Sequence, residues 1–223
     1  MGGQILGEVY NPDPNNEIAR RMLEEFESRR AFPLRDVRRR SFGHGGVYAL
    51  YYNGPFALYQ SIRSPDSRIP IYIGKADGDV GTRLKSHFKS INNAYNLDLD
   101  HFTVRVLPLT AAWAVWTEAL FHEHYDPLWI RGAFTGFGNN NPGSKRSDGK
   151  ASNWDVIHPG REWALTMSRS SNARVQLKAE QERWKLENAN LVVELFGGKA
   201  QVEDDSDDPD EILDLFALFS TDR

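Results

Sequence analysis

The spacing of hydrophobic and polar positions predicts a small α/β core in the middle of the chain. Two runs rich in aromatic and β-branched residues, 46–52 and 69–75, predict strands, and the alternating residues 101–109 predict a third. Apolar residues at helical spacing predict two helices, over residues 82–95 and 110–125. Both helices begin at a threonine, a residue type that favours the N-cap position. The order strand, strand, helix, strand, helix indicates an α/β (α+β) fold in which helices flank a three-stranded sheet.

Further helices are predicted on both sides of this core. Residues 15–31 place apolar side chains on one helical face, and the arginine-rich stretch 35–40 follows as a surface connection. Residues 173–196 are also helical in character. The chain therefore divides into an N-terminal helical extension at 1–45, a core with a long loop at 46–165, a helical region at 166–202 and an acidic tail at 203–223.

A long polar loop lies within the core. Residues 136–153 are rich in Gly, Asn, Ser and Lys, and a Pro159-Gly160 turn before a helix near Arg161 follows them. Loops of this length without structure of their own are uncommon inside a compact domain. We therefore expect this loop to be either functional or disordered.

Charge is distributed unevenly along the chain. The sequence has 27 Lys and Arg against 31 Asp and Glu, but residues 203–223 hold nine of the acids and one of the bases. Residues 1–202 therefore carry a formal net charge of +4. A mildly basic body permits nucleic-acid binding through local clusters of charge without demanding it.

The composition excludes several kinds of site. There is no cysteine, which rules out disulfides and thiolate zinc centres. No segment approaches the roughly 18 apolar residues that span a membrane, and the start has no signal-peptide pattern. We expect a cytoplasmic protein that does not associate with membranes.

Three polar residues in the predicted helices are candidates for chemistry. Arg83 and His87 are four residues apart, so both face one side of their helix. Glu118 lies in the otherwise apolar segment 111–120, where a carboxylate is costly unless it is paired or bound to a cation. For each residue alone, an exposed polar face or a structural salt bridge is the plainer interpretation.

Two aromatic motifs complete the set. Gly46-Val47-Tyr48 lies in the first predicted strand and Tyr72-Ile73-Gly74 in the second. With Arg83, His87 and Glu118 they match the pattern of the GIY-YIG nuclease superfamily, which this chain resembles over roughly residues 46–164. Longer runs, above all WDVIHPGREWA at 154–164, are similar to the type II restriction endonucleases that cut CCGCGG. The resemblance implies a mixed, mainly antiparallel sheet of three strands.

The resemblance also implies hydrolysis of phosphodiester bonds in double-stranded DNA with one Mg²⁺ per active site. Glu118 would be the metal ligand, and Arg83 would stabilise negative charge in the transition state. Tyr48, with His87 as its proton acceptor, would deprotonate the attacking water. Tyr72 would hold that water or a phosphate oxygen by hydrogen bonding.

A GC-rich palindrome requires donors for guanine edges and for phosphates. Cleavage of both strands of a palindrome implies a twofold homodimer, and a restriction endonuclease implies a partner DNA methyltransferase. The candidate DNA-binding residues are Lys75, Asn139, Asn140, Asn141, Lys145, Arg146 and Arg161.

One position departs from the family pattern. The family has an Asn directly after Pro-Leu-Trp, and this chain has Ile130, whose side chain cannot form hydrogen bonds. A neighbour among residues 139–141 is a possible substitute. Two alternatives to an active restriction endonuclease therefore stay open: a catalytically impaired GIY-YIG module that binds DNA, and a repair or mobile-element nuclease of the superfamily. The acidic tail is interpreted as a solvated terminus, or as a competitor of DNA for the basic groove.

Overall fold

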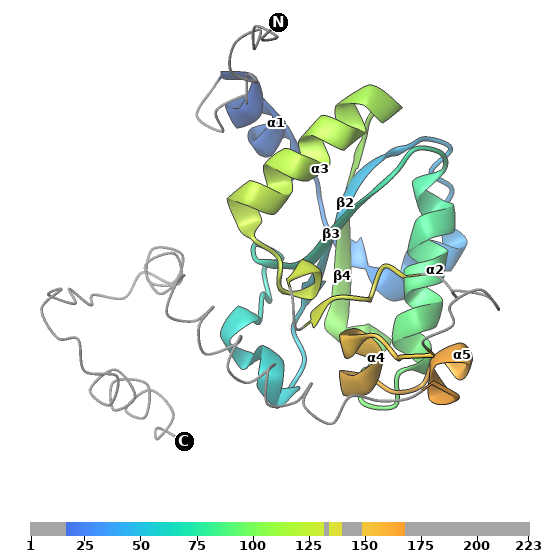
Figure 1. Cartoon of the computed structure of the whole chain (residues 1–223). Coiled ribbons are helices and arrows are strands. Elements are labelled where there is room, and N and C mark those ends of the chain that lie inside the picture. The colour runs from blue at the N-terminus through green and yellow to red at the C-terminus, as the bar shows by residue number, and fades with distance from the viewer. Residues whose placement is uncertain (1–16, 132–133, 140–148, 168–223) are drawn as a thin grey trace, which may run out of the picture. The chain divides into compact units, whose positions relative to one another are not determined.

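The computed structural model describes residues 17–131, 134–139 and 149–167 (Figure 1). The expectations for the helical region at 173–196 and for the acidic tail lie outside these residues. None of the helices in the described part is long and apolar enough to cross a membrane.

A four-stranded sheet forms the centre of the fold, with the order β1-β4-β2-β3. The strands are β1 (Phe32–Pro33), β2 (Gly46–Tyr52), β3 (Pro70–Ala76) and β4 (Phe102–Pro108). All three pairings are antiparallel, so the sheet is not mixed as the resemblance implied. The three strands of the predicted core are confirmed, and β2 has the predicted bounds.

The fourth strand, β1, corrects the predicted count of three. It comes from the segment assigned to the N-terminal extension and pairs with β4 through Phe32 and Val104. Two residues are too few to show the alternation that identifies a strand in sequence. Pro33 also lacks a backbone N–H, which suits a sheet edge and argues against a longer strand.

One face of the sheet is covered by α1 (Glu17–Ser28) and α3 (Ala111–Tyr125). Residues of β2 alternate between the two faces, and its odd-numbered residues turn toward these helices. The main core joins these two helices to β2, β3 and β4, and includes Phe26, Val47, Ala49, Tyr51, Ile73, Leu107 and Phe121. All seven residues of β2 are buried, because the strand has a partner on each side and a helix over each face.

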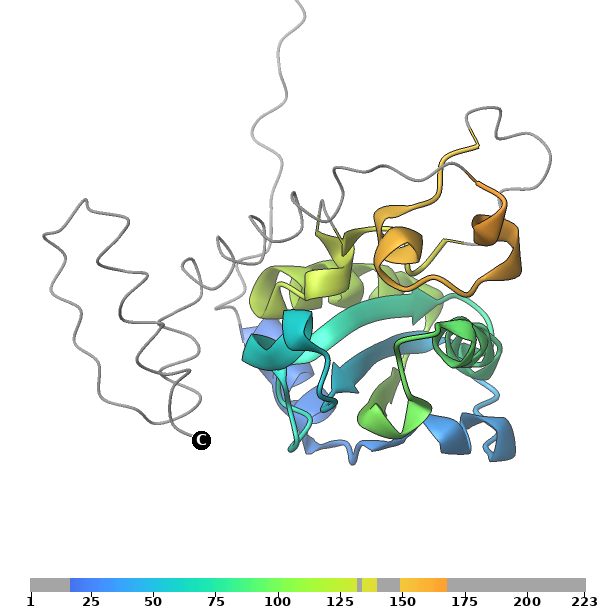
Figure 2. The ribbon, with the colours of Figure 1, turned by 90° about the horizontal axis from the view of Figure 1, so that it is seen from below.

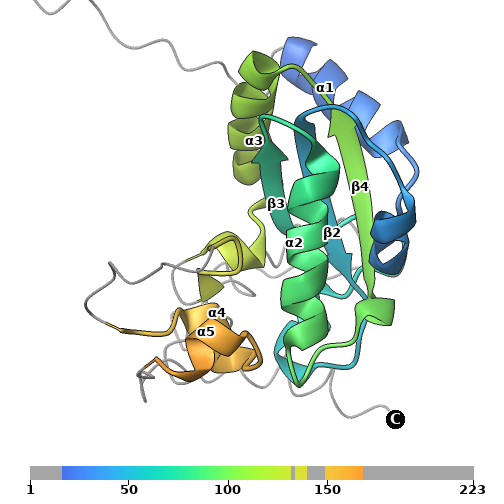
Figure 3. The same ribbon diagram turned by 90° about the vertical axis from the view of Figure 1, so that its right-hand side faces the viewer.

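The opposite face is covered by α2 (Val80–Asn93), so α2 and α3 lie on either side of the strands (Figure 1). Seen onto this face, α2 crosses in front of β2 (Figure 3). The helix begins two residues before the predicted Thr82, and its N-cap is Asp79, whose side chain accepts a hydrogen bond from the Gly81 N–H. Aspartate is a strong N-cap because its carboxylate satisfies a free N–H of the first turn. The predicted N-cap of α3, Thr110, occupies that position without a side-chain cap hydrogen bond.

Short helices complete the described structure. The arginine-rich stretch forms a 3₁₀ helix, η1 (Leu34–Arg39), with Leu34 and Val37 buried and its arginines exposed. The other short helices are η2 (Ala57–Ile62), η3 (Leu99–His101), η4 (Leu128–Ile130), α4 (Asn153–Ile157) and α5 (Glu162–Leu165).

The segment that carries α4 and α5 packs beside the C-terminal end of α2 (Figures 2 and 3). The Tyr95 N–H donates to the Pro159 carbonyl at 2.9 Å, and a Cβ on Gly160 would lie 1.7 Å from the Asn93 carbonyl oxygen. Gly160 also has a φ of +150°. The predicted Pro-Gly turn therefore brings the end of the core against α2, and only glycine fits there.

Candidate active site

The candidate residues come together near the β3 edge of the sheet. Tyr48 on β2 is fully buried, and its hydroxyl oxygen lies 2.7 Å from Nε2 of His87 on α2. His87 is itself 2% exposed. The strand and the helix, 39 residues apart in sequence, thus form one buried hydrogen-bonded pair.

Tyr72 and Gly74 place the second motif against the first. The Tyr72 ring lies 6.3 Å from the Tyr48 ring and 5.2 Å from the His87 ring, measured between centroids. Gly74 is opposite Tyr48 in the β2–β3 register, and a Cβ there would lie 2.6 Å from the Tyr48 hydroxyl oxygen. The glycine of the second motif therefore leaves the space that the first tyrosine occupies.

Arg83 extends from α2 to the same phenols. Its positive charge and its hydrogen bonding lower the pKa of both Tyr48 and Tyr72, against the larger effect of burial. Its Nη2 also donates to the Gly138 carbonyl oxygen at 2.8 Å. The arginine predicted to meet a phosphate thus lies beside both tyrosines and holds a backbone carbonyl of the polar loop.

Glu118 reaches the sheet from α3. Because β3 is an edge strand, one side of its backbone has no strand partner, and α3 supplies partners from two successive turns. Glu118 accepts a hydrogen bond from the Lys75 backbone, and His122 Nε2 lies 3.1 Å from the Ile73 carbonyl oxygen. The partner that the carboxylate requires is therefore a backbone group next to Gly74, and among the described residues it forms no salt bridge of the kind that the plainer interpretation expected. Lys75 pairs its own ammonium with Asp77 at 2.8 Å.

Burial sets the protonation states of the site. It lowers the pKa of His87 to about 3, with the charges of Arg83 and Arg161 acting in the same direction. Burial raises the pKa of Tyr48, with Tyr72 adding to the effect, and it raises the pKa of Tyr72. At neutral pH His87 is therefore neutral, and in the tautomer that carries its proton on Nδ1 its Nε2 accepts the hydrogen bond from the Tyr48 hydroxyl. Burial also raises the pKa of the half-buried Glu118, so a cation beside it would favour its charged form.

The start of the polar loop closes over this set. Phe137 is stacked on the His87 imidazole, with centroids 4.6 Å apart, and meets the Tyr72 ring edge-on at 4.9 Å. A Cβ on Gly138 would lie 2.7 Å from the Tyr72 hydroxyl oxygen. This part of the loop is therefore a packed wall of the site.

Arg161 anchors that wall. Its guanidinium is held by the Asp155 carboxylate, at 2.5 and 2.7 Å, and lies 4.7 Å from the ring centroids of Trp154 and Trp163. It also donates to the carbonyls of residues 136, 137 and 139 at 3.0–3.2 Å. Arg161 is 4% exposed, so a direct contact with DNA would require this network to open. The position gives Arg161 a structural role that the sequence did not predict.

The remaining candidate residues are at least partly exposed next to the site, or lie outside the described residues. Asn139 is exposed, directly beyond the wall. Ile130 is partly exposed at the end of η4. The residues outside the described part are Asn140, Asn141, Lys145 and Arg146.

Two elements of the site were missed at the level of sequence. Phe137 reads as part of a polar loop, and nothing in its spacing ties it to His87. Asp155 had a usable signal, since it is an acid between Trp154 and Val156 and such a carboxylate needs a cationic partner. Arg161, six residues later, is that partner.

The donor set for a metal is small. Within the described ranges no three His, Asp or Glu side chains form a group that could hold an ion. Glu118 is thus a single carboxylate whose burial a cation would offset. Such a set suits Mg²⁺, which binds through one or two carboxylates and completes its shell with water and substrate phosphates.

Comparison with known proteins agrees with this geometry. Residues 78–184 match the family described as the Eco29kI GIY-YIG domain, a range that includes Arg83, His87 and Glu118 and begins after the two tyrosine motifs. No curated protein matches the chain. The tyrosine motifs join the matched region through the hydrogen bond between Tyr48 and His87. Over residues 78–184 the chain is therefore similar to the Eco29kI GIY-YIG domain, a match that supports an affinity with the GIY-YIG nucleases.

Proposed function

We propose that this protein is a Mg²⁺-dependent type II restriction endonuclease that cuts both strands of a GC-rich palindrome. The observation that carries the proposal is the buried hydrogen bond between Tyr48 and His87, with Arg83 beside it and Glu118 at the adjoining strand edge. A proton acceptor, a fixed positive charge and a carboxylate are the groups that phosphodiester hydrolysis needs.

Tyr48 and His87 act as one unit for proton transfer. The attacking water gives a proton to the Tyr48 hydroxyl oxygen while the Tyr48 proton passes to His87 Nε2 across 2.7 Å. This relay avoids a free phenolate, which burial makes costly by raising the pKa of Tyr48. The incoming phosphodiester is negative, so it offsets the positive charge of Arg83 and raises the pKa of His87 as the proton arrives.

Arg83 supplies positive charge where the transition state gains negative charge. Its guanidinium keeps its charge at all relevant pH values, and its forked donors match phosphate oxygens. When DNA binds, the phosphate competes with the Gly138 carbonyl for the Arg83 donors. Tyr72, with its hydroxyl beside the wall residue Gly138, is placed to hold a phosphate oxygen or the water.

Glu118 would hold the Mg²⁺. Hydrogen bonding from the Lys75 backbone fixes its carboxylate beside the strand that carries Tyr72. A bound Mg²⁺ supplies Lewis-acid polarisation of the phosphate and stabilises charge on the leaving oxygen. One protein carboxylate is enough for this ion because it keeps several of its waters.

Specificity and assembly rest on the resemblance to enzymes that cut CCGCGG. The residues proposed to contact DNA are Lys75, Asn139, Asn140, Asn141, Lys145, Arg146 and, if its network opens, Arg161. A palindrome cut on both strands is expected to be bound by a twofold homodimer. A DNA methyltransferase of the same specificity is the expected functional partner.

Digestion of a plasmid of known sequence tests this function. Purified protein with Mg²⁺ should give discrete fragments whose ends map to one GC-rich palindrome, and chelation of the metal should leave the plasmid intact. A folded protein that leaves the plasmid unaltered in Mg²⁺ would contradict the proposal. Nicking at branched or damaged DNA alone would favour a repair nuclease.

Ile130 supports a second candidate, an impaired DNA-binding module. It follows Trp129, whose ring lies 4.4 Å from that of Phe137 in the wall of the site, and it has no group that can hydrogen bond. DNA binding without cleavage, converted to cleavage by Ile130→Asn, would favour this candidate. Full cleavage by the native chain would exclude it.

A further inference from the structure

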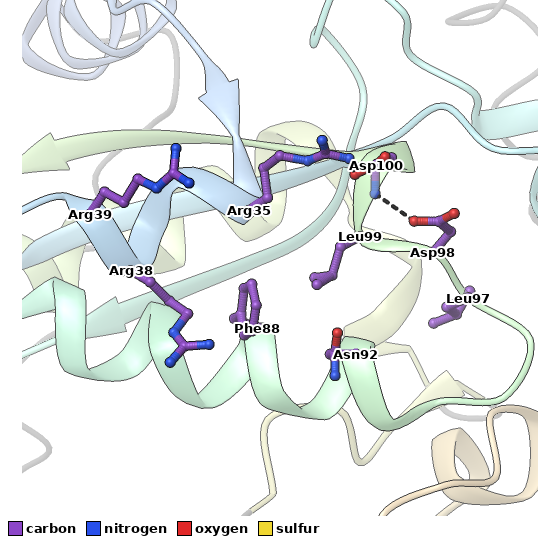
Figure 4. Close-up of a pocket in the computed structure, with 9 residues that line it drawn as sticks. All are labelled: Arg35, Arg38, Arg39, Phe88, Asn92, Leu97, Asp98, Leu99 and Asp100. Carbon is purple, nitrogen blue, oxygen red and sulfur yellow. Dashed lines mark hydrogen bonds and ion pairs between the residues drawn. The ribbon is translucent and has the colours of Figure 1, made fainter.

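A second basic surface lies on the other flank of α2 from the candidate active site. Arg35, Arg38 and Arg39 of η1 line an open depression of about 660 Å³ together with Phe88 and Asn92 of α2 (Figure 4). Phe88 lies about 140° around the helix from Arg83, since each helical residue turns the chain by about 100°. The depression and the active site therefore flank one helix.

The arginines of η1 differ in their pairing. Arg35 forms an ion pair with Asp100, which neutralises its charge. Arg38 and Arg39 are exposed, and no carboxylate of the described residues is paired with either. Arg38 reaches over the Phe88 ring, with its guanidinium carbon 5.6 Å from the centroid, so η1 and α2 hold its charge in place (Figure 4).

Two lysines carry positive charge across the exposed side of α2. Lys85 and Lys89 are exposed, and no described carboxylate pairs with them. At helical spacing they lie about 160° and 120° from Arg83, measured around the solvent side. A basic strip of four residues, Arg38, Arg39, Lys85 and Lys89, therefore runs from the depression toward the flank that carries Arg83.

We propose that this basic strip binds the phosphates of the DNA duplex outside the recognition sequence. The proposal rests on the proposed function, since it requires DNA at Arg83. A helix is about 10 Å across, and one DNA strand carries a phosphate about every 3.4 Å of the duplex axis, so a duplex that crosses α2 presents about three phosphates of one strand to it. Exposed Lys and Arg bind such phosphates without reading sequence.

The shape of the surface favours a duplex over a small anion. Asp98 lines the far end of the depression and repels a phosphate that would enter it, and Asp100 at the same end already occupies Arg35. Arg38 and Arg39 lie at the opposite end of the depression (Figure 4), and the helical spacing places Lys85 and Lys89 next to it on the exposed side of α2. A continuous polyanion can contact all of them at once, whereas a single phosphate cannot.

The salt dependence of binding tests the strip. Dissociation constants for a duplex containing CCGCGG, with flanks of about one helical turn, are measured over a range of salt in a Glu118→Gln background. Arg38→Ala/Arg39→Ala and Lys85→Ala/Lys89→Ala should each reduce the slope of log affinity against log salt by about 2. When the DNA flanks are shortened to about a quarter of a helical turn, the strip loses its phosphates. The slope of log affinity against log salt for the background protein should then fall toward the slope of the double variants.

Arg20→Ala/Arg21→Ala is the charge-matched control. Both arginines are exposed on α1, which covers the other face of the sheet, and both pair with Glu17. Its slope should equal that of the background protein. Unchanged slopes in the strip variants, or an equal fall in the control, would overturn the strip while plasmid cleavage still supports the nuclease. Loss of all DNA binding and cleavage in the native chain would overturn both.

Discussion

The ring of Phe137 is stacked on the imidazole of His87, with centroids 4.6 Å apart and ring planes 19° from parallel. A residue of the polar loop thus excludes water from the group proposed to receive the proton. The same loop gives Arg83 a carbonyl partner at Gly138. Residues that lie next to the proposed DNA-reading segment therefore set the environment of the proposed chemistry.

Removal of the Phe137 ring should raise the pKa of His87. Burial lowers this pKa to about 3, and Phe137→Ala exposes the imidazole, which favours its charged form. The pKa of His87, followed by NMR titration of the imidazole, should rise by at least about one unit. An unchanged His87 pKa in Phe137→Ala would contradict the covering role.

Gly74→Ala should impair cleavage much more than Gly78→Ala. The new methyl at position 74 would lie 2.6 Å from the Tyr48 hydroxyl oxygen, whereas position 78 has nothing within 4 Å. Displacement of Tyr48 from His87 by about 1 Å is expected to reduce the single-turnover rate by roughly 10²-fold. Overpacking should also lower the free energy of unfolding by about 1–3 kcal/mol. Equal rates in the two variants would show that the hydroxyl position is unimportant.

Arg161→Ala should destabilise the fold by about 3–5 kcal/mol, because it leaves Asp155 as a buried charge without its partner. Arg20→Ala is the matched control, since its ion pairs with Glu17 and Glu24 are exposed and contribute little to stability. Denaturant unfolding measures both. A cost at Arg161 no larger than that at Arg20 would contradict the anchoring role.

Acid should destabilise this protein through its buried histidines. His158 is fully buried, hydrogen bonds to Tyr59, and has a pKa lowered to about 3. Because the unfolded chain protonates at about pH 6.5, the contribution is complete above that pH and is lost as pH falls from 6.5 toward 3. Between pH 7 and pH 5 it amounts to about 2 kcal/mol.

His158→Gln isolates this contribution. The loss of unfolding free energy between pH 7 and pH 5 should be smaller in the variant by about 2 kcal/mol, since all other titrating groups are common to both proteins. Equal losses in the native and variant proteins would show that His158 does not titrate on unfolding.

The periodic parts of the fold were predictable from sequence, because burial on one or both faces leaves a regular signal. The strand at Gly46–Tyr52 has the predicted bounds, and α3 begins after the predicted Thr110 and ends at Tyr125. The spacing of Arg83 and His87 and the costly position of Glu118 marked these residues as candidates, and the resemblance to the GIY-YIG superfamily joined them into one proposed site. These signals are local to one element.

Features that depend on two distant segments were not predictable. Residues 32–33 become a strand only because β4 offers a free edge. Arg161 seemed a donor for DNA because its partners, the carbonyls of residues 136, 137 and 139, have no sequence signature. The start of α2 was misplaced because both Asp79 and Thr82 suit the N-cap position, and only the fold shows that the Asp79 carboxylate accepts from the Gly81 N–H.

The most direct test of a nuclease site at this sheet edge is the single-turnover rate of DNA cleavage in Mg²⁺ for Glu118→Gln and Glu123→Gln. Both residues lie on α3, but Glu118 is half-buried at the β3 edge and Glu123 is exposed. Glu118→Gln should reduce the rate by at least about 10²-fold while DNA binding is retained, and Glu123→Gln should cleave at the native rate. Cleavage by Glu118→Gln at the native rate would contradict the account.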